Sequence, residues 1–449
     1  MINQAAITNK LATENIGKLI WTYSLPAITG TVVMSLYNVV DRIFIGQGVG
    51  PLAISGMALT FPFMIFLMAF GMLIGAGSAA RISITLGENN TEKAEKILAN
   101  AFTLTLIISG AVVIISYIFM TDVLKLFGGT DKTMHYAKDF MRIIIPGGIF
   151  TALSYGFNNI MRACGYPTKA MYTMIICAII NATLAPIFIF GFHWGIQGAA
   201  WATNISYLVG TVWVLSHFLQ KSSNLRFHRK NFRLKKEVVK SIISIGMSPF
   251  SMQLATCCVV LLVNSTLIRY GGDLAIGAFG IINSVNTLII MIIIGLNQGT
   301  QPIIGYNYGA KNFNRMFSTL KYAVVIGSCI TTIGFIIGTF FSDKTAALFT
   351  SDIELQAIAS KALRISVTLF PIIGSQIVIT NFFQSIGKAK VSIFLSLTRQ
   401  FLFLIPCLII LPPITGLNGA WYAMPVSDGL ATIVALATIF IFVRKFRSK

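Results

Sequence analysis

The sequence divides into a series of apolar stretches, each long enough to cross a lipid bilayer as a helix. A membrane-spanning helix needs about 20 predominantly apolar residues. The chain of 449 residues supplies twelve such stretches, at 19–46, 53–85, 97–119, 139–160, 170–191, 197–219, 241–268, 275–307, 319–341, 358–383, 391–411 and 418–443. We therefore predict an all-α polytopic membrane protein with twelve transmembrane helices.

The composition excludes a soluble globular chain. Hydrophobic residues make up 55% and charged residues 11% of the sequence, whereas soluble domains carry about 25% charged residues. The residues before the first span are polar and run directly into a long span, so we expect no cleavable signal peptide. The six cysteines have no CxxC spacing, which predicts neither a disulfide framework nor a metal site.

The net charge of +20 is distributed unevenly between alternate loops. If both termini are cytoplasmic, only a few basic residues fall outside, namely Lys125, Lys132, Lys138, Arg269 and Lys344. The positive-inside rule then fixes this orientation in the cell membrane. The basic run at 226–230 could suggest nucleic-acid binding, but the topological role explains it and we expect no nucleic-acid partner. Arg162 and Lys169 bracket a short loop and are assigned the same topological role.

The sequence also contains an internal duplication. At an offset close to 222, punctuating residues of the two halves coincide, as in Pro26 with Pro249, Gly77 with Gly299, and Gly195 with Gly416. We predict an amino-terminal lobe over 1–220, a basic cytoplasmic linker over 221–240 and a carboxy-terminal lobe over 241–449. Because each copy has six spans, the lobes would be parallel repeats about an axis along the membrane normal, with substrate binding at their interface.

Two matched prolines lie in the first helix of each half. Pro26 and Pro249 each remove a backbone donor and predict a bend in their helix. A bent helix can serve as a hinge between two packings, or it can be a static kink.

Two carboxylates lie within apolar spans, Asp41 and Asp428. An ionisable group at bilayer depth is costly and indicates a functional site. The alternatives for Asp41 are an interfacial acid that reaches water and a local ion pair with Arg42. For Asp428, buried opposite charges usually pair, and Arg399 in the preceding span is the expected partner; a direct part in ion or substrate binding is the alternative, which makes this pair a possible second polar site.

Several of these residues, taken together, resemble a known family. The sequence is similar to multidrug and toxic compound extrusion (MATE) transporters in Pro26, Asp41-Arg-Ile-Phe-Ile-Gly46, Leu86-Gly87, Arg162-Ala-Cys-Gly165 and Gly198-Ala-Ala-Trp-Ala-Thr203. The resemblance implies export of amphiphilic, mostly cationic compounds by alternating access, driven by inward flow of H⁺ or Na⁺. It also implies a coupling site in the amino-terminal lobe, which would consist of Asp41, Tyr37, Asn181 and Thr203.

The sequence departs from the family pattern beside this site. Family members often carry a second acid four residues after Asn181, where this chain has Ala185. The seventh, eighth and tenth spans contain no acid, so coupling in the carboxy-terminal lobe would need neutral ligands or Asp428. Because no carboxylate cluster is present, H⁺ is favoured over Na⁺.

Other functions fit the sequence less well. The alternative is a flippase or exporter of a lipid-linked or other endogenous amphiphile on the same superfamily fold. A wide cavity lined by several Arg residues would favour it, but buried Arg residues are scarce in this sequence. The four His residues are scattered, and neither a HExxH pair nor a P-loop is present. We therefore expect a monomeric transporter that is not an enzyme and has no cofactor and no metal.

Overall fold

The structure is a computed structural model that describes residues 10–126, 131–221 and 223–447. Within these residues every regular element is a helix, and no β-strand occurs. The first half forms α2 (Ile16–Gly48), α3 (Pro51–Gly87), α4 (Thr91–Ile118), α5 (Met120–Leu126), α6 (Asp131–Ala163), α7 (Pro167–Pro186) with the π-helical turn η1 (Ile187–Gly191), and α8 (Gly195–Leu219).

The second half repeats this pattern. A short helix, η2 (Arg229–Asn231), precedes it. Then follow α9 (Lys236–Gly309), α10 (Phe313–Phe340), α11 (Ser342–Ala347), α12 (Ile353–Ser366), α13 (Phe370–Ser385), α14 (Ala389–Leu397), the π-helical η3 (Thr398–Leu404), α15 (Ile405–Thr415) and α16 (Leu417–Arg447). Helix α9 contains two spans that meet at Gly272, whose φ of 65° is accessible because glycine lacks a Cβ.

These elements provide the twelve predicted spans. In the described part of the chain, ten helices are long and apolar enough to cross a membrane, and the bent pair α12 and α13 makes an eleventh. The twelfth, α8, has 25 residues but is less apolar. Its polar side chains are buried inside the protein, among them Thr203, Asn204, Tyr207 and Thr211.

The internal repeat is visible in the order of the helices. Helices α4, α6, α7 and α8 have their counterparts in α10, α12, α14 and α16, each of which begins 222 residues later in the chain. Even the short helices α5 and α11 follow this offset. The sequence coincidences therefore reflect two copies of one helical unit.

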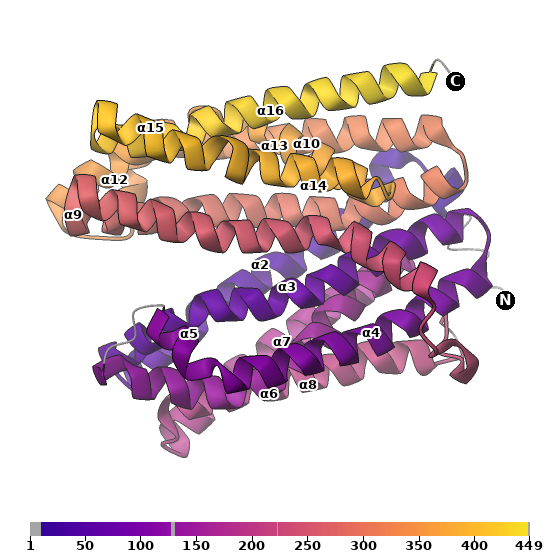
Figure 1. Cartoon of the computed structure of the whole chain (residues 1–449), viewed down its shortest axis with the longest axis horizontal. Coiled ribbons are helices and arrows are strands. Elements are labelled where there is room, and N and C mark those ends of the chain that lie inside the picture. The colour runs from indigo at the N-terminus through magenta and orange to yellow at the C-terminus, as the bar shows by residue number, and fades with distance from the viewer. Residues whose placement is uncertain (1–9, 127–130, 222, 448–449) are drawn as a thin grey trace.

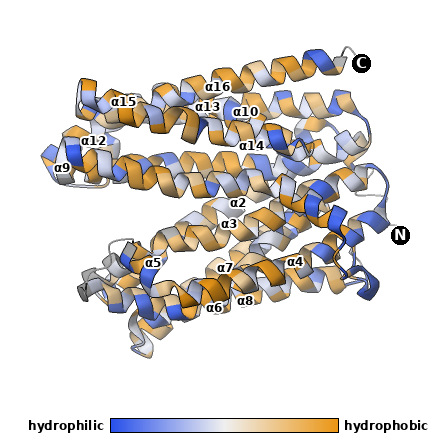
Figure 2. Ribbon diagram, in the orientation of Figure 1, coloured by the Kyte–Doolittle hydropathy of each residue, from blue (hydrophilic) through white to orange (hydrophobic). Residues whose placement is uncertain are grey.

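The two halves occupy separate parts of the molecule. In Figure 1 most of the first half, in indigo to magenta, lies below the second half, in orange to yellow, while the indigo start of the chain reaches up beside the second half. Both chain termini lie at one end, here called the terminal end. From there the halves diverge toward the other end, here called the opposite end. Hydrophilic residues gather at the two ends and along the linker, while the stretch between them is mostly apolar (Figure 2). The predicted fold of two six-helix lobes is confirmed.

The buried apolar residues explain this shape. One core cluster contains residues of both halves, such as Ile74 and Ile82 with Ile242 and Ile303. A second cluster contains only residues between Val259 and Met424, and a third only residues between Phe44 and Ala202. The lobes thus share a core toward the terminal end, and each has a core of its own toward the opposite end.

The tenth predicted span, 358–383, is not one helix. The structure breaks it into α12 and α13, which meet at an angle of 57°. Pro371 lies in the first turn of α13, and a proline disfavours helical backbone in the residue before it. The break is therefore local in origin.

The linker is bound to the amino-terminal lobe rather than loosely solvated. The side-chain amide of Asn100 in α4 donates hydrogen bonds to the carbonyls of Asn231 (2.9 Å) and Arg233 (3.3 Å), and its Oδ1 accepts one from the Lys235 backbone N–H (2.8 Å). Phe227 and Phe232 of the linker contact the ring of Phe102. Helix α9 begins at Lys236, so the last five residues of the predicted linker, 236–240, are helical.

The linker contacts predict the effect of Asn100→Ala. The substitution leaves buried backbone groups of the linker without partners, so we expect the free energy of unfolding to fall by about 1–3 kcal/mol. The measurement is the melting temperature of the purified protein in detergent. The control is Ser216→Ala, which removes an exposed hydroxyl bonded to Trp213 within its own helix; equal melting temperatures for both variants would contradict the contribution of Asn100.

Candidate functional site

The first predicted site residues lie one turn apart on α2. Tyr37 and Asp41 occupy positions i and i+4, which face the same side of a helix. The Asp41 side chain is 4% exposed, so it is buried rather than interfacial. Asn38, in contrast, is exposed, and its amide donates to the carbonyl of Met34 in its own helix. Asn38 therefore does not belong to the site.

Three helices bring Tyr37, Asn181 and Thr203 together. The Nδ2 atom of Asn181 on α7 donates hydrogen bonds to the Tyr37 hydroxyl (3.3 Å) and to Oγ1 of Thr203 on α8 (3.0 Å). The Tyr37 and Thr203 hydroxyls share a third hydrogen bond of 3.3 Å. Asn181 and Thr203 are both buried. The structure thus assembles three of the four predicted residues into one hydrogen-bonded triangle.

Asp41 lies beside this triangle. It is close enough for its charge to act on Tyr37 and on Tyr207. Tyr207 follows Thr203 by one turn of α8, so both face the same interior. The site is therefore a single polar region in the amino-terminal lobe.

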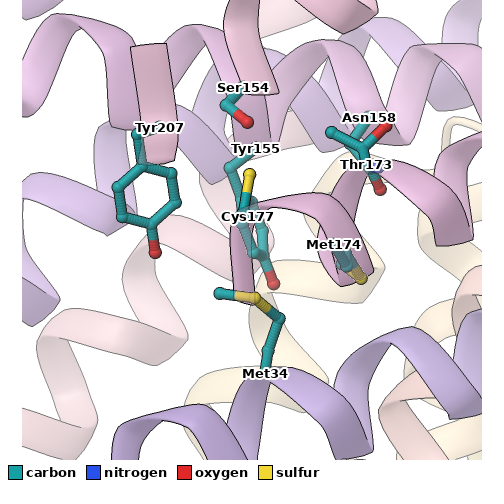
Figure 3. A pocket seen from close by; sticks show the side chains of 8 residues that line it. All are labelled: Met34, Ser154, Tyr155, Asn158, Thr173, Met174, Cys177 and Tyr207. Carbon is teal, nitrogen blue, oxygen red and sulfur yellow. The ribbon is translucent and has the colours of Figure 1, made fainter. Parts of the chain in front are cut away.

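A pocket adjoins this polar region. It is small and is lined by Met34, Ser154, Tyr155, Asn158, Thr173, Met174, Cys177 and Tyr207. In Figure 3 these side chains come from different helices and surround one space. Gly210 on α8 has no side chain where a Cβ would collide with Cys177 and Ser154, which lets α8 pack closely on the helices that carry them.

Sequence reasoning missed part of this region. The buried residues Thr151, Ser154, Asn158 and Arg162 recur along α6 at spacings of three or four. This spacing places them on one face of the helix. The pattern is present in the sequence and could have been recognised as a polar stripe facing the lobe interior.

Arg162 does not lie in an exposed loop. Its side chain is 2% exposed, and Nη2 donates to Oδ1 of Asn159 at 2.5 Å. No ion pair is present for it within the described ranges. Arg162 therefore belongs to the lobe interior, and its topological role stays a prediction.

Ala185, at the position of the missing second acid, is fully buried. It packs in the apolar cluster of the amino-terminal lobe with Ile45 and Ile189. The polar region therefore ends against hydrocarbon at this point. Within the described residues, no group of three or more His, Cys, Asp or Glu could hold a metal ion.

The second pair of predicted residues also lies together. Nε of Arg399 in η3 is 2.6 Å from Oδ1 of Asp428 in α16, and the Asp428 side chain is 3% exposed. Arg399 lies in a π-helical turn, a rare local geometry that often marks functional positions. The carboxy-terminal lobe therefore contains a buried ion pair and not an isolated carboxylate.

Both predicted hinge prolines lie inside continuous helices. Pro26 is in α2 and Pro249 is in the first span of α9. In α9 the one residue with non-helical backbone angles is Gly272. The hinge role of the two prolines stays a prediction.

Comparison with known proteins places the chain in a family. The MatE family model matches it twice, over residues 26–187 and 249–410. The chain belongs to the MatE family. The two matches begin at Pro26 and Pro249, so each copy of the repeat is one MatE unit, and the protein is a multi-pass membrane transporter.

The similarity to known proteins extends over nearly the whole of this MatE-family chain. The multidrug export protein MepA of Staphylococcus haemolyticus (strain JCSC1435) is 27% identical over 95% of this chain and 94% of its own. The MATE multidrug transporter DinF-BH, solved with a bound ligand, is 37% identical with a TM-score of 0.90, covering 95% and 96% of the two chains. A MOP superfamily transporter from Pyrococcus furiosus Vc1, in which reverse polarity of the binding pocket suggests a different function, is 25% identical with a TM-score of 0.91, covering 98% and 97%.

The ion pair of the carboxy-terminal lobe yields a stability prediction. Asp428→Ala leaves the Arg399 charge without its partner, so we expect a loss of about 3–5 kcal/mol in the free energy of unfolding. The double variant Asp428→Asn, Arg399→Gln removes both charges and should recover most of this loss. Melting followed by tryptophan fluorescence provides the measurement, because Trp421 is buried in α16. A double variant as unstable as Asp428→Ala would contradict the pairing argument.

Proposed function

We propose that this protein exports amphiphilic, mostly cationic small molecules by cation-coupled antiport, with H⁺ favoured over Na⁺ as the coupling ion. It works as a monomer in the cell membrane with both termini in the cytoplasm. Asp41 takes up the cation, and Tyr37, Asn181 and Thr203 form the polar site around it. The observation that carries this proposal is the hydrogen-bonded triangle beside the buried Asp41.

The chemistry of this site favours a proton. Its carboxylate is single, because Ala185 replaces the second acid of the family pattern. Two hydroxyls and one amide supply few oxygen ligands beside it, whereas hydrated cations such as Na⁺ must exchange their water for a full set of oxygens. A proton needs only one acceptor atom.

The packing of the lobes supports alternating access. The shared core lies toward the terminal end, and each lobe keeps its own core at the opposite end. With the termini in the cytoplasm, this arrangement is closed on the cytoplasmic side and open on the external side. Pro26 and Pro249 are the proposed hinges, and the Arg399–Asp428 pair braces the last two helices of the carboxy-terminal lobe.

The side chains around the pocket suit an amphiphilic substrate once the lobe interior opens. Methionine adapts to ligands of different shape, and Met34 and Met174 line the pocket together with the rings of Tyr155 and Tyr207. The similarity to the multidrug transporter DinF-BH and to the multidrug exporter MepA supports a drug-like ligand. Such a ligand would contact π faces and sulfur, which attract cations weakly and hydrocarbon well.

The second candidate is a flippase or exporter of a lipid-linked or other endogenous amphiphile. The Pyrococcus furiosus transporter, with its reversed pocket polarity, supports the idea that this fold serves more than one function. An anionic headgroup would need basic residues in the pocket wall. Among the described residues that line the pocket, none is charged, so we favour the cationic amphiphile.

The energetic demand of antiport is modest. One unit charge crossing 100 mV supplies about 2.3 kcal/mol. One pH unit adds about 1.4 kcal/mol for a proton. Exchange of one proton for one monovalent cation moves no net charge, so the pH term alone drives it and supports a substrate gradient of about tenfold per pH unit; a neutral amphiphile would also gain the potential term.

The decisive test is efflux from proteoliposomes under separately imposed proton and Na⁺ gradients, with ethidium as a fluorescent amphiphilic cation. In the parent protein we expect a proton gradient to drive export of the dye, and a Na⁺ gradient alone to leave it near the passive rate. Asp41→Asn should reduce gradient-driven export by about tenfold or more, because the amide cannot load a proton at neutral pH. The control is Asn38→Ala, on the same helix but exposed and outside the site. Undiminished proton-driven export by Asp41→Asn would overturn the coupling role.

The triangle yields a separate prediction. Tyr37→Phe removes a hydroxyl that contacts both Asn181 and Thr203. Losing these two contacts, each worth about 1 kcal/mol, should shift the proton concentration for half-maximal export by up to about thirtyfold and leave the maximal rate nearly unchanged. The pH dependence of efflux measures this shift, and an unchanged profile would exclude Tyr37 from the site.

A further inference from the structure

Helix α2, which carries Asp41, is divided between the two lobes. Near the terminal end it packs on α9 of the carboxy-terminal lobe. Oγ of Ser24 donates to the carbonyl of Leu296 at 3.4 Å, and Oγ1 of Thr31 donates to the carbonyl of Met291 at 3.2 Å. Between them, Gly295 meets the backbone of Ile28 so closely that an added Cβ would lie 2.6 Å from its Cα atom. The first half of α2 is therefore tightly seated on the other lobe.

The second half of α2 belongs to the amino-terminal lobe. Tyr37 bonds to Asn181 and Thr203, and the ring of Phe44 packs edge-on against Phe190 with 6.4 Å between centroids. The contacts with the two lobes meet around Thr31, because Gly30 already lies against Met174 of α7, where an added Cβ would be 2.5 Å from the sulfur atom, while Thr31 bonds to α9. One continuous helix thus connects the Asp41 site to the closed end of the lobe interface.

The residues that precede α2 are held by the carboxy-terminal lobe as well. Leu11 is 2% exposed and belongs to the core shared by the lobes. Nη2 of Arg315 on α10 donates to the carbonyls of Leu11 (3.2 Å) and Glu14 (2.6 Å). Nδ2 of Asn307 on α9 lies 3.4 Å from the same Leu11 carbonyl and donates to it.

Arg315 is suited to holding this segment. No ion pair to a carboxylate is recorded for it in the part of the chain that the structure describes. Its charge is instead directed at two main-chain carbonyls, and hydrogen bonds from a charged donor are stronger than neutral ones. One side chain of α10 therefore fixes the chain that leads into α2.

We propose that Arg315 is a positioning residue for transport, which fastens the start of α2 to the carboxy-terminal lobe and holds the terminal end closed. Parting of the lobes at this end requires that the Arg315 contacts break or that α2 bends between its two attachments. Because α2 also carries Asp41, the state of the Asp41 site acts on this closure through a single helix. This inference rests on the proposed function of Asp41 and adds the residue that holds the gate.

The alternative is that Arg315 is a static anchor. A static anchor would stabilise both access states equally, so its loss would lower the melting temperature without changing the balance of states. A positioning residue contributes to the closed state alone. The two roles therefore predict different separations of the lobes at the terminal end when Arg315 is replaced.

The experiment measures that separation directly. Spin labels are placed at Glu88 on the amino-terminal lobe and Lys390 on the carboxy-terminal lobe, both exposed, in the full chain with its native cysteines replaced. In Arg315→Ala we expect the ratio of short to long label distances to fall about tenfold, in line with the loss of charged hydrogen bonds. The control is Lys321→Ala, which removes an exposed charge from the same helix and should leave the distribution unchanged.

Arg315→Lys keeps the charge but replaces the guanidinium fork with a single ammonium, and it should give an intermediate distribution. It also serves as the test if Arg315→Ala does not fold. A distance distribution equal to that of the parent in the folded Arg315 variants would overturn the proposal.

A change of pH separates this proposal from the function of Asp41. If Asp41 does not couple transport, the parent distribution will not respond to pH, yet Arg315→Ala will still shift it. If Arg315 is only an anchor, the parent will respond to pH and Arg315→Ala will behave like the parent. Both responses together, with the pH effect reduced in Arg315→Ala, support the complete proposal.

Discussion

Buried polar groups need partners inside the protein, because hydrocarbon offers none. The interior of the amino-terminal lobe is organised around this requirement. Helices α2, α7 and α8 each direct one polar side chain to the same point, where Tyr37, Asn181 and Thr203 hydrogen-bond to one another beside Asp41. The polar residues of α8 meet this need. Its hydroxyls face the interior, and its exposed face keeps Trp201, Val212 and Trp213.

The two lobes repeat one scaffold but not its chemistry. At an offset of 222 the counterpart of Asp41 is Val263, which is 1% exposed and packs in the apolar cluster of the carboxy-terminal lobe, and one residue on, at the offset of Pro26 and Pro249, it is Asn264, so neither is an acid. That lobe places its buried charges elsewhere, as the Arg399–Asp428 pair between its last two helices. The charges of Arg399 and Asp428 cancel, and each side chain holds the other in place. A site that loads and releases a cation is therefore better served by the amino-terminal lobe, and the duplication supplies a matching body for it to move against.

The sequence predicts those features whose physical cause is local. The spans follow from the length of apolar helix that a bilayer requires, and Asp41 stands out because an acid in such a helix is costly. The spacing of Tyr37 places it on the face of Asp41, but Asn181 and Thr203 required the family resemblance, since nothing local distinguishes them from other buried amides and hydroxyls. The positions of Tyr155 and Tyr207 depend on how three helices rotate against one another. Arg162 differs from them, because its spacing from Thr151, Ser154 and Asn158 along α6 was present in the sequence as a polar stripe.

The linker shows the same limit in another form. Its composition is that of a solvated tether, yet Asn100 binds its backbone and Phe102 its aromatic rings. Backbone groups can be bound by any amide that reaches them, so polarity alone does not separate a docked segment from a free one. Because the linker is fixed to the amino-terminal lobe, relative motion of the lobes has to be taken up at or after Lys236, where α9 begins.

The buried charges of the amino-terminal lobe act on the tyrosines beside the proposed coupling site. Asp41 acts on Tyr207, Arg162 acts on Tyr155, and the two tyrosines interact with each other along the pocket. If a proton loads on Asp41 as proposed, the field at Tyr37 and at Tyr207 changes, because the Asp41 charge acts on both. Tyr37 lies on α2 and Tyr207 on α8, so the proposed loading would act on two helices of the site and not on Asp41 alone.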